Sequence, residues 1–544
     1  MKKKKKQKTT KIMAMLLSAT MLTSVIPQRN FIVKAETSSE TVNKDAFVTT
    51  DFAKNNSLVY NAESYTSSNK VTLVKSVNGP DEDSRLITAS AGGYLVYSGI
   101  DMTNVQILMM IASADKANAG KKIEIRLDSP NGTKAGELTL IDKSNKNYRN
   151  TSTLASGFRE NFDVVFYDHY TDISVTSGIH DLYFVFLAET TVDIDWFTVS
   201  SYIGENEELK KERMKWWNDA SYGQFIHFGA YSLLAGEVKD DNGKAFIRDG
   251  AHGAEWIMLD SGIRKRETYE KQATKLFNPS AFSAEQVVKE AKEAGQKYII
   301  FTSRHHEGLS MYDTKAREFS DFSIMNEESC PAYTSRVDIT KELAKECQKQ
   351  GIHFGVYTTI MDFHDKSQDF EGRAEVLTRD IKLLGDVNEY ITRLKMQMRE
   401  LMVNYGCEVF FFDGQWVSWW TSKIGDEVSK YMRTINPNVI INNRVGKSTK
   451  NDGDYSTPEN NIPATGFDYN WESCMTLNNT WGYNKNDNNW KNTSRVISMV
   501  VQCASGGGNL LLNIGPKGDG TLPASSSKVL RESGEWLQKF GESI

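Results

Sequence analysis

The second half of the chain alternates amphipathic helical segments with short apolar runs. Ser283 is placed to cap a helix over 284–294, and Gly295 ends that helix just before an apolar run that starts at Tyr298. The same order returns further along the chain. It gives a helix from Asp338 to Gly351 with a strand at 352–357, a helix around 390–405 with a strand at 409–413, and a helix near 426–435 with a strand at 438–442. Because no glycine-rich phosphate loop follows any of these strands, we expect an α/β fold, specifically a (β/α) barrel over 215–544.

Several of these apolar runs end on polar or ionisable side chains. The run 408–412 is followed by Asp413 and Gly414, which places one carboxylate between a buried strand and the residue that best permits a sharp turn. A lone Asp-Gly pair is ordinary turn chemistry. Four other runs, however, also end on polar residues, namely on His227, on Arg304 to His306, on Tyr357 and on Arg444. The carboxyl ends of parallel strands share one face of a barrel, so the pattern predicts an active site on that face.

The first half of the chain has a different pattern, with short alternating runs separated by turn signals. The run 122–127, for example, precedes the turn sequence DSPNG at 128–132. The run 182–187 is followed by a further alternating run at 193–199. No strong helical period is present, so an all-β sandwich module is predicted over 36–201. The densely charged stretch that follows is typical of a solvated helix face or a linker, and we place a linker at 202–214.

The N-terminal residues have the three parts of a secretory signal peptide. A basic region at 2–6 precedes an apolar stretch at 12–25, and Val33-Lys34-Ala35 forms a small-residue cleavage site. The apolar stretch is interrupted by Ser and Thr, and no later segment reaches the ~18 apolar residues of a membrane span. We therefore expect a signal peptide at 1–35, no membrane span, and a secreted mature protein.

Composition narrows the possible partners and the redox chemistry. The net charge is −5 and the sequence pI is about 6.0, and no basic stripe is present, so nucleic acid is not an expected partner. Aromatic residues make up 11% of the 544 residues, which is compatible with a carbohydrate ligand. Five cysteines in so long a chain do not form a disulfide framework, and we expect Cys347 and Cys407 to lie in the core.

Carboxylates are the best candidates for chemistry at the predicted face. Glycoside hydrolysis needs two carboxyl groups, about 5–5.5 Å apart for retention of configuration and about 6.5–9.5 Å apart for inversion. Asp413 suits the ionised role, whereas Glu459 and Glu472 both follow the strand that carries Arg444 and are candidates for the acid. Glu472 lies beside an aromatic residue, where burial would raise its pKa, and the residues alone do not separate the two glutamates.

A metal centre is the alternative use for the histidines of this half. Zinc and iron sites combine His with carboxylate or Cys at ligand spacing, and two adjacent residues on one strand end cannot easily face one ion. His305 and His306 are adjacent in this way, which suits donors to hydroxyl groups better than metal ligands. We therefore expect no cofactor for catalysis.

A set of short motifs runs through the second half. It comprises QFIHFG at 224–229, AEW at 254–256, RHHEG at 304–308, GVY at 355–357, FDG at 412–414, NR at 443–444 and GGNLLLNIGP at 507–516. With this set, the chain from Trp217 onwards resembles the α-L-fucosidases of glycoside hydrolase family 29. The resemblance implies a retaining, exo-acting enzyme that releases terminal α-L-fucose from fucosylated glycans through a covalent fucosyl-enzyme. With the signal peptide, we expect this enzyme to be secreted.

The resemblance also implies roles for individual residues. Asp413 corresponds to the nucleophile, and we favour Glu459, in its Thr-Pro-Glu setting, over Glu472 as the acid/base residue. Phe411 stands where many members of the family have Trp, and the context of Asp413 resembles that of the broad-specificity subgroup. The positions that match residues holding the sugar are His227, Glu255, Trp256, His305, His306, Tyr357, Arg444 and Trp416.

Motifs of the first half are similar to those of family 6 carbohydrate-binding modules. They are YNAESY at 60–65, IEIRLDSP at 123–130, GIHDLY at 178–183 and DWF at 195–197. The resemblance implies a β-sandwich with a structural calcium held partly by Glu63 and Asp195, whose carboxylate oxygens are the ligands that calcium prefers. Tyr94 and Tyr97 are candidates for a sugar-binding platform. A sandwich that serves only as a spacer is the alternative.

Two other functions remain open at this point. One altered pocket residue can change the sugar, so a barrel glycosidase of another specificity is the first alternative. The second is a non-catalytic glycan-binding protein with an inactive barrel, which would require the predicted carboxylates to be dispensable.

Overall fold

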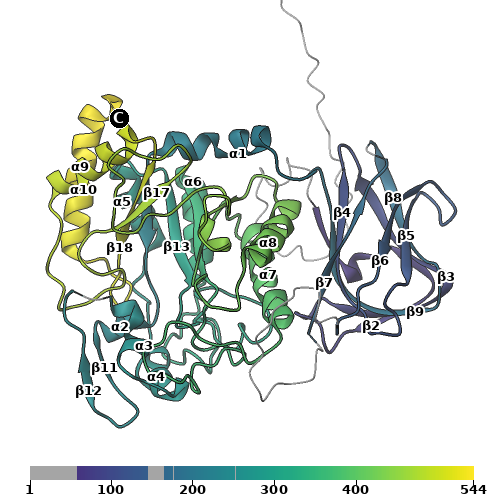
Figure 1. Ribbon diagram of the computed structural model, residues 1–544, viewed down its shortest axis with the longest axis horizontal. Helices are drawn as coiled ribbons and strands as arrows, with labels where there is room; N and C mark the ends of the chain where they lie inside the picture. Colours follow the sequence, from purple (N-terminus) through teal and green to yellow (C-terminus); the bar gives the residue numbers. More distant parts are fainter. Residues whose placement is uncertain (1–57, 145–163, 176, 252, 544) are drawn as a thin grey trace, which may run out of the picture. The chain divides into compact units, whose positions relative to one another are not determined.

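The structure is a computed structural model that describes residues 58–144, 164–175, 177–251 and 253–543, and it contains an all-β region followed by an α/β region (Figure 1). The predicted signal peptide at 1–35 lies outside the described residues. Among the residues that are described, no helix combines the length and the apolar character needed to cross a membrane.

The all-β region is a nine-stranded arrangement with a hydrophobic core of its own. Its strands follow the order β6-β5-β8-β3-β9-β4-β7, with β1 paired to β9 and β2 paired to β3. The long strand β3 pairs with β9 through its first half and with β8 through its second half, so it connects two layers. The strands are β1 (Leu58–Asn61), β2 (Ser67–Lys75), β3 (Arg85–Asp101), β4 (Ile107–Ser113), β5 (Lys122–Leu127), β6 (Lys134–Thr139), β7 (Tyr167–Asp172), β8 (Ile179–Phe186) and β9 (Thr190–Ser200).

The stretch predicted as a linker is helical for most of its length. Helix α1 (Glu207–Ala220) begins at Asn206, whose side-chain oxygen accepts a hydrogen bond from the Leu209 N–H at 2.9 Å. Arg213, within the predicted linker, is buried and pairs with Asp454 at 2.6 Å. From Glu207 onwards the stretch is thus a helix with a solvated charged face, which is one of the two interpretations of this pattern, and Arg213 anchors it to the α/β region.

The α/β region is built on seven parallel strands in the order β16-β15-β14-β13-β10-β18-β17. The strands are β10 (Tyr222–Ile226), β13 (Tyr298–Arg304), β14 (His353–Thr359), β15 (Val409–Asp413), β16 (Ile440–Ile441), β17 (Glu472–Thr476) and β18 (Asn509–Ile514). Between the edge strands, residues 455–459 form only isolated bridges, to Asn442 on one side and to Trp471 and Cys474 on the other. The predicted α/β class is confirmed as a curled parallel sheet, whereas a full closed barrel is not.

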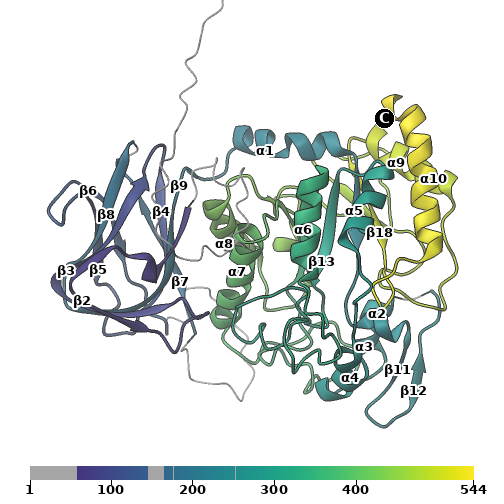
Figure 2. The same cartoon turned by 180° about the vertical axis from the view of Figure 1, so that it is seen from behind.

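Helices follow the strands as the capping signals predict. Ser283 accepts a hydrogen bond from the Gln286 N–H at 3.2 Å at the start of α5, and Asp338 caps α6 in the same way. Gly351 ends α6 with φ of 73°, a left-handed conformation that glycine adopts without strain. Helices α9 and α10 pack together beside β18 (Figure 2). The main helices are α5 (Ala284–Glu293), α6 (Ile339–Gln350), α7 (Val387–Val403), α8 (Ser422–Ile435), α9 (Thr493–Ser505) and α10 (Ala524–Phe540).

All five cysteines are buried and unpaired, which confirms the expectation that Cys347 and Cys407 lie in the core.

Candidate active site

A cavity of about 130 Å³ lies at the carboxyl ends of the parallel strands, on the face where the sequence predicts a site. Residues from β10, β14, β15 and β17 contribute to it, together with His305, which directly follows β13, and the short 3-10 helix Asn443–Val445 that follows β16. The side chains that line it are Phe225, His227, Trp256, His305, Tyr357, Arg379, Phe411, Asp413, Trp416, Arg444, Glu459, Cys474 and Trp481.

Asp413 is the last residue of β15, and it is only 8% exposed. Its Oδ1 accepts a hydrogen bond from Arg444 Nη1 at 2.7 Å, and its Oδ2 accepts one from the Tyr357 hydroxyl at 2.9 Å. His306 Nε2 lies 3.4 Å from the same Oδ2. Burial alone would raise the pKa of Asp413, but the Arg444 guanidinium and His306 outweigh it and hold this pKa well below its usual range. Asp413 is therefore an ionised carboxylate with a fixed orientation.

Arg444 connects Asp413 to the second carboxyl group. Its Nη1 binds Asp413, whereas its Nη2 donates to Glu459 Oε2 at 3.0 Å. Because both oxygens bind amino groups of one planar guanidinium, the two oxygens lie within about 8 Å of each other. The Glu459 side chain is 47% exposed, in contrast to the buried Asp413. The site thus pairs an enclosed carboxylate with a solvent-accessible carboxyl group, and glycoside hydrolysis needs two carboxyl groups of this kind.

Two histidines and a tyrosine form one wall of the cavity. The His305 ring stacks on Tyr357 with ring centroids 5.1 Å apart, and His227 Nδ1 donates a hydrogen bond to Asn513 Oδ1 at 2.7 Å. Burial lowers the pKa of His227 to about 3, and burial together with the neighbouring imidazoles lowers the pKa of His305 well below its usual range. These two rings are therefore neutral, and a neutral imidazole has one donor and one acceptor nitrogen for hydroxyl groups.

Comparisons with known proteins agree with this geometry. Residues 195–542 match the family model for α-L-fucosidase. The chain belongs to the α-L-fucosidase family. It is a glycoside hydrolase by that membership. An α-L-fucosidase of Dictyostelium discoideum is 27% identical over 356 residues, covering 60% of this chain and 70% of that one. Residues 61–201 match the family 6 carbohydrate-binding module.

Solved structures of fucosidases superimpose on the same region. α-L-Fucosidase isoenzyme 1 from Paenibacillus thiaminolyticus aligns with a TM-score of 0.51 and 30% identity, over 62% of this chain and 77% of that one. A trapped covalent intermediate of a GH29 α-L-fucosidase from Bacteroides thetaiotaomicron aligns with a TM-score of 0.50 and 26% identity, over 63% and 77% of the two chains.

Tryptophans form the rim of the fucosidase cavity. Trp256 and Trp416 lie there as the sequence predicts, with ring centroids 6.1 Å apart, and the Arg379 guanidinium stacks on Trp256 at 4.1 Å. Trp481 completes the rim, 5.1 Å from the His227 ring. Sequence analysis missed Arg379 and Trp481, because both lie in long loops without a strand that would place them at this face.

Glu255 contributes to the fucosidase site indirectly. It is buried and does not line the cavity; its Oε2 accepts a hydrogen bond from the Gly482 N–H at 2.8 Å. Gly482 directly follows Trp481, so Glu255 holds the segment that carries this tryptophan. Burial raises the pKa of Glu255 to about 7.

Glu472 does not belong to the fucosidase site. It is the first residue of β17, is fully buried, and accepts a hydrogen bond from the Tyr298 hydroxyl. Burial raises the pKa of Glu472 to about 8. It starts its strand, whereas the cavity lies at the strand ends, so the structure places it at the wrong position for the acid/base role considered for it.

The calcium site predicted at Glu63 and Asp195 stays a prediction. Among the described residues, no three His, Cys, Asp or Glu side chains are grouped as a metal site. The Arg399 guanidinium instead lies 3.7 Å from Asp81 and donates to Asn61 Oδ1 at 3.0 Å. The Arg399 guanidinium thus supplies positive charge close to the buried Asp195 and Asp81.

The predicted aromatic platform of the sandwich also differs from the structure. Tyr97 is 1% exposed and belongs to the core, so it cannot contact a sugar. Tyr94 is half-buried, and its ring lies 5.3 Å from that of Tyr183 on the paired strand β8. Successive residues of a strand face opposite sides of the sheet, so Tyr94 and Tyr97, three residues apart in β3, point to opposite faces and cannot form one platform.

Proposed function

We propose that the protein is a secreted, retaining exo-α-L-fucosidase that removes terminal α-L-fucose from glycans. The observation that carries this proposal is the Arg444 guanidinium, which holds Asp413 and Glu459 at the mouth of one small cavity. The cavity, at about 130 Å³, suits a single sugar ring rather than an internal segment of a glycan. The covalent intermediate of the Bacteroides thetaiotaomicron relative supports retention, and the N-terminal pattern at 1–35 supports export.

In the first step Asp413 attacks the anomeric carbon, and the bond to the leaving oxygen breaks. The ionised state and fixed orientation of Asp413 prepare it for this attack. Glu459, which is accessible at the cavity mouth, gives its proton to the leaving oxygen. In the second step Glu459 takes a proton from water as the water displaces Asp413 and releases fucose. Arg444 stays paired with Asp413 and orients Glu459 throughout.

The remaining wall selects the sugar. The neutral His227 and His305 exchange hydrogen bonds with ring hydroxyls; His305 Nδ1 has no partner among the described residues and is free to do so. Trp256, Trp416 and Trp481 offer apolar faces to the ring and to the methyl group of fucose. We further propose that the sandwich binds carbohydrate, with Tyr94 and Tyr183 as its aromatic platform.

Hydrolysis of 4-nitrophenyl α-L-fucoside with azide as an external nucleophile tests this proposal. The wild type should turn over, Asp413→Ala should lose turnover in the absence of azide, and azide should restore activity to Glu459→Ala. The product should be α-fucosyl azide, because azide displaces Asp413 from the β-linked fucosyl-enzyme and so restores the configuration of the substrate. Glu472→Gln is the matched control, because it changes a glutamate outside the cavity and should keep activity without azide. Rescue of a Glu472 variant in place of Glu459, or turnover of another aryl glycoside in preference to the fucoside, would overturn the assignment.

A further inference from the structure

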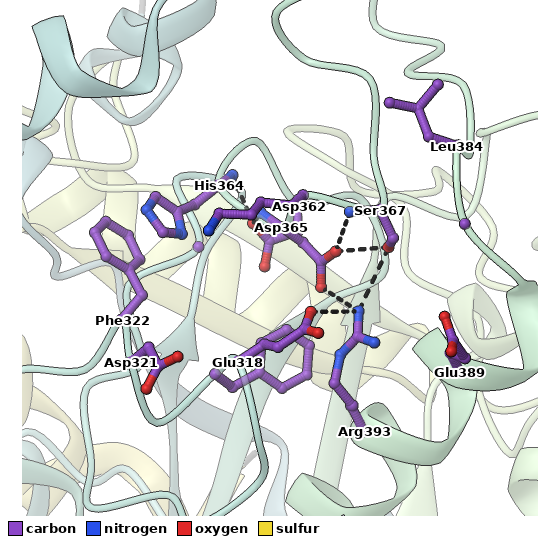
Figure 3. A pocket seen from close by; sticks show the side chains of 14 residues that line it. Glu318, Asp321, Phe322, Asp362, His364, Asp365, Ser367, Leu384, Glu389 and Arg393 are labelled. Atoms are coloured by element: carbon purple, nitrogen blue, oxygen red, sulfur yellow. Dashed lines mark hydrogen bonds and ion pairs between the residues drawn. The ribbon is translucent and has the colours of Figure 1, made fainter. Parts of the chain in front are cut away.

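A second, larger cavity of about 330 Å³ lies next to the strand ends and shares no lining residue with the candidate active site (Figure 3). Its walls come from the loop after β13, the loop after β14 and the first turns of α7. Small-molecule sites commonly measure about 300–1,000 Å³, so this cavity has room for a ligand of one or two rings. Nothing in the proposed hydrolysis uses it.

Arg393 is the central polar group of this cavity. Its side chain is only 3% exposed, and its Nη2 pairs with Asp365 at 2.8 Å and lies 3.4 Å from Glu318, as Figure 3 shows. Its buried Nε has no hydrogen-bond partner among the described residues. A buried donor without a partner costs free energy, so an acceptor oxygen from a ligand would satisfy it.

The charge of the lining excludes an anionic ligand. Asp362 is already neutralised by an ion pair with Arg304. The remaining carboxylates of the lining outnumber its cations. The exposed Asp321 and Lys366 are not bonded to any side chain in the described part of the chain. An excess of carboxylate oxygens repels phosphate, sulfate or carboxylate and accepts hydrogen bonds from hydroxyl groups. The charged lining residues are Glu318, Asp321, Asp362, Asp365, Glu389, Lys366 and Arg393.

One wall is aromatic. The His364 ring stacks on Phe322 with centroids 3.4 Å apart and planes within 1°, and its Nε2 is hydrogen-bonded to Glu270 at 3.1 Å. A rigid aromatic pair opposite a set of hydroxyl acceptors and a guanidinium donor is the lining that recognises a sugar ring, whose faces are apolar and whose edge is polar.

We propose that this cavity is a second carbohydrate-binding site of the α/β region, for a neutral sugar unit. The proposal extends the proposed glycosidase function, since the sugar is either a further unit of the same glycan or a separate saccharide. Its binding groups are Arg393 and Asp321 as hydrogen-bonding partners of the hydroxyls, and the His364–Phe322 pair as the stacking surface.

The second site is joined to the candidate active site through Phe363. This residue lies between Asp362 and His364, its N–H donates to the His306 carbonyl at 2.7 Å, and its ring packs 6.0 Å from Trp256. His306 in turn contacts Asp413. A sugar that contacts His364 is therefore connected to Asp413 through Phe363 and His306. Through this connection, binding of a sugar at the second site can change the affinity of the active site for fucosides.

Isothermal titration of lactose into the full-length protein tests the site independently of catalysis. Asp321→Asn/Lys366→Ala and, separately, His364→Ala remove binding groups without touching the buried Arg393 pair or the active site. Glu327→Gln/Lys423→Ala is the matched control, because it makes the same charge change at exposed positions outside the cavity. We expect lactose affinity to fall about tenfold in both cavity variants and to stay unchanged in the control. Any affinity of the sandwich for lactose is the same in the wild type and in all the variants, so it does not contribute to the difference between them.

Hydrolysis distinguishes the source of the sugar. If the site holds another unit of the substrate, the KM for a fucosylated oligosaccharide rises in the cavity variants while kcat/KM for 4-nitrophenyl α-L-fucoside stays unchanged. If it holds a separate saccharide, lactose affinity falls in the cavity variants, whereas the KM for the oligosaccharide, measured without lactose, stays unchanged. Lactose affinity equal to wild type in both cavity variants, or tighter cavity binding of the anionic 3′-sialyllactose, overturns the proposal. Failure of the wild type to cleave the aryl fucoside would refute only the proposed function, since lactose binding is measured without it.

Discussion

Glu472→Gln is expected to make the protein more resistant to alkaline pH without loss of activity. Glu472 is fully buried against Tyr298, its Oε1 has no hydrogen-bond partner among the described residues, and burial raises its pKa to about 8. In the unfolded chain a glutamate has a pKa of about 4.3. Between these two pH values the folded protein therefore keeps a proton that the unfolded chain has released.

The sign and size of the effect follow from proton linkage. Because the folded state binds more protons, the free energy of unfolding falls as pH rises, by about 1.4 kcal/mol per pH unit for one such group. Glutamine does not titrate, so the free energy of unfolding of the variant does not fall with pH for this reason. From pH 5 to pH 8 the stability of Glu472→Gln relative to wild type should rise by about 3–4 kcal/mol. Other buried glutamates with raised pKa values, such as Glu255, titrate in both proteins and cancel.

Urea unfolding of both proteins at pH 5, 6, 7 and 8, followed by tryptophan fluorescence, measures this difference. Glu327→Gln is the control, because it changes the same functional group at an exposed position. A stability difference that does not change with pH would show that Glu472 is not protonated in the folded protein. A loss of aryl fucoside hydrolysis would return Glu472 to the candidates for the acid/base residue.

Three further outcomes follow from the contacts of single residues. Arg444→Lys should lower kcat for the aryl fucoside about 100-fold with little change in melting temperature, because one ammonium group cannot hold Asp413 and Glu459 together; near-normal kcat would contradict this role. Trp481→Ala should lower kcat/KM about tenfold, mainly through KM, if this ring contacts the sugar, and an unchanged KM in steady-state kinetics would exclude that contact. Arg399→Ala should destabilise the protein by about 3 kcal/mol because it leaves buried carboxylates unpaired. If this guanidinium supplies the positive charge at Asp195 in place of calcium, EGTA should leave the wild-type melting temperature unchanged, and a lower melting temperature in EGTA would support the calcium prediction.

Much of the fold and part of the site are local properties of the sequence. Helix caps such as Ser283 and Asp338 act within one turn, and the apolar run that ends at Asp413 marks both a buried strand and its carboxyl end. Parallel strands place all their carboxyl ends on one face, so strand-end residues such as His227 and Tyr357 were brought together by the strand pattern itself. That these residues lie close together can therefore be predicted without knowing the conformation of the loops.

Tertiary structure decided what depends on contacts between distant segments. Glu459 and Glu472 both follow the Arg444 strand, but only the pairing of β17 with β18 shows that Glu472 starts a strand and is buried away from the cavity. Trp481 reaches the cavity because Glu255, more than 200 residues earlier, binds the adjacent N–H. Pocket-forming loops and buried ion pairs are set by such long-range packing, and local patterns in a sequence carry no record of which distant group will be the partner.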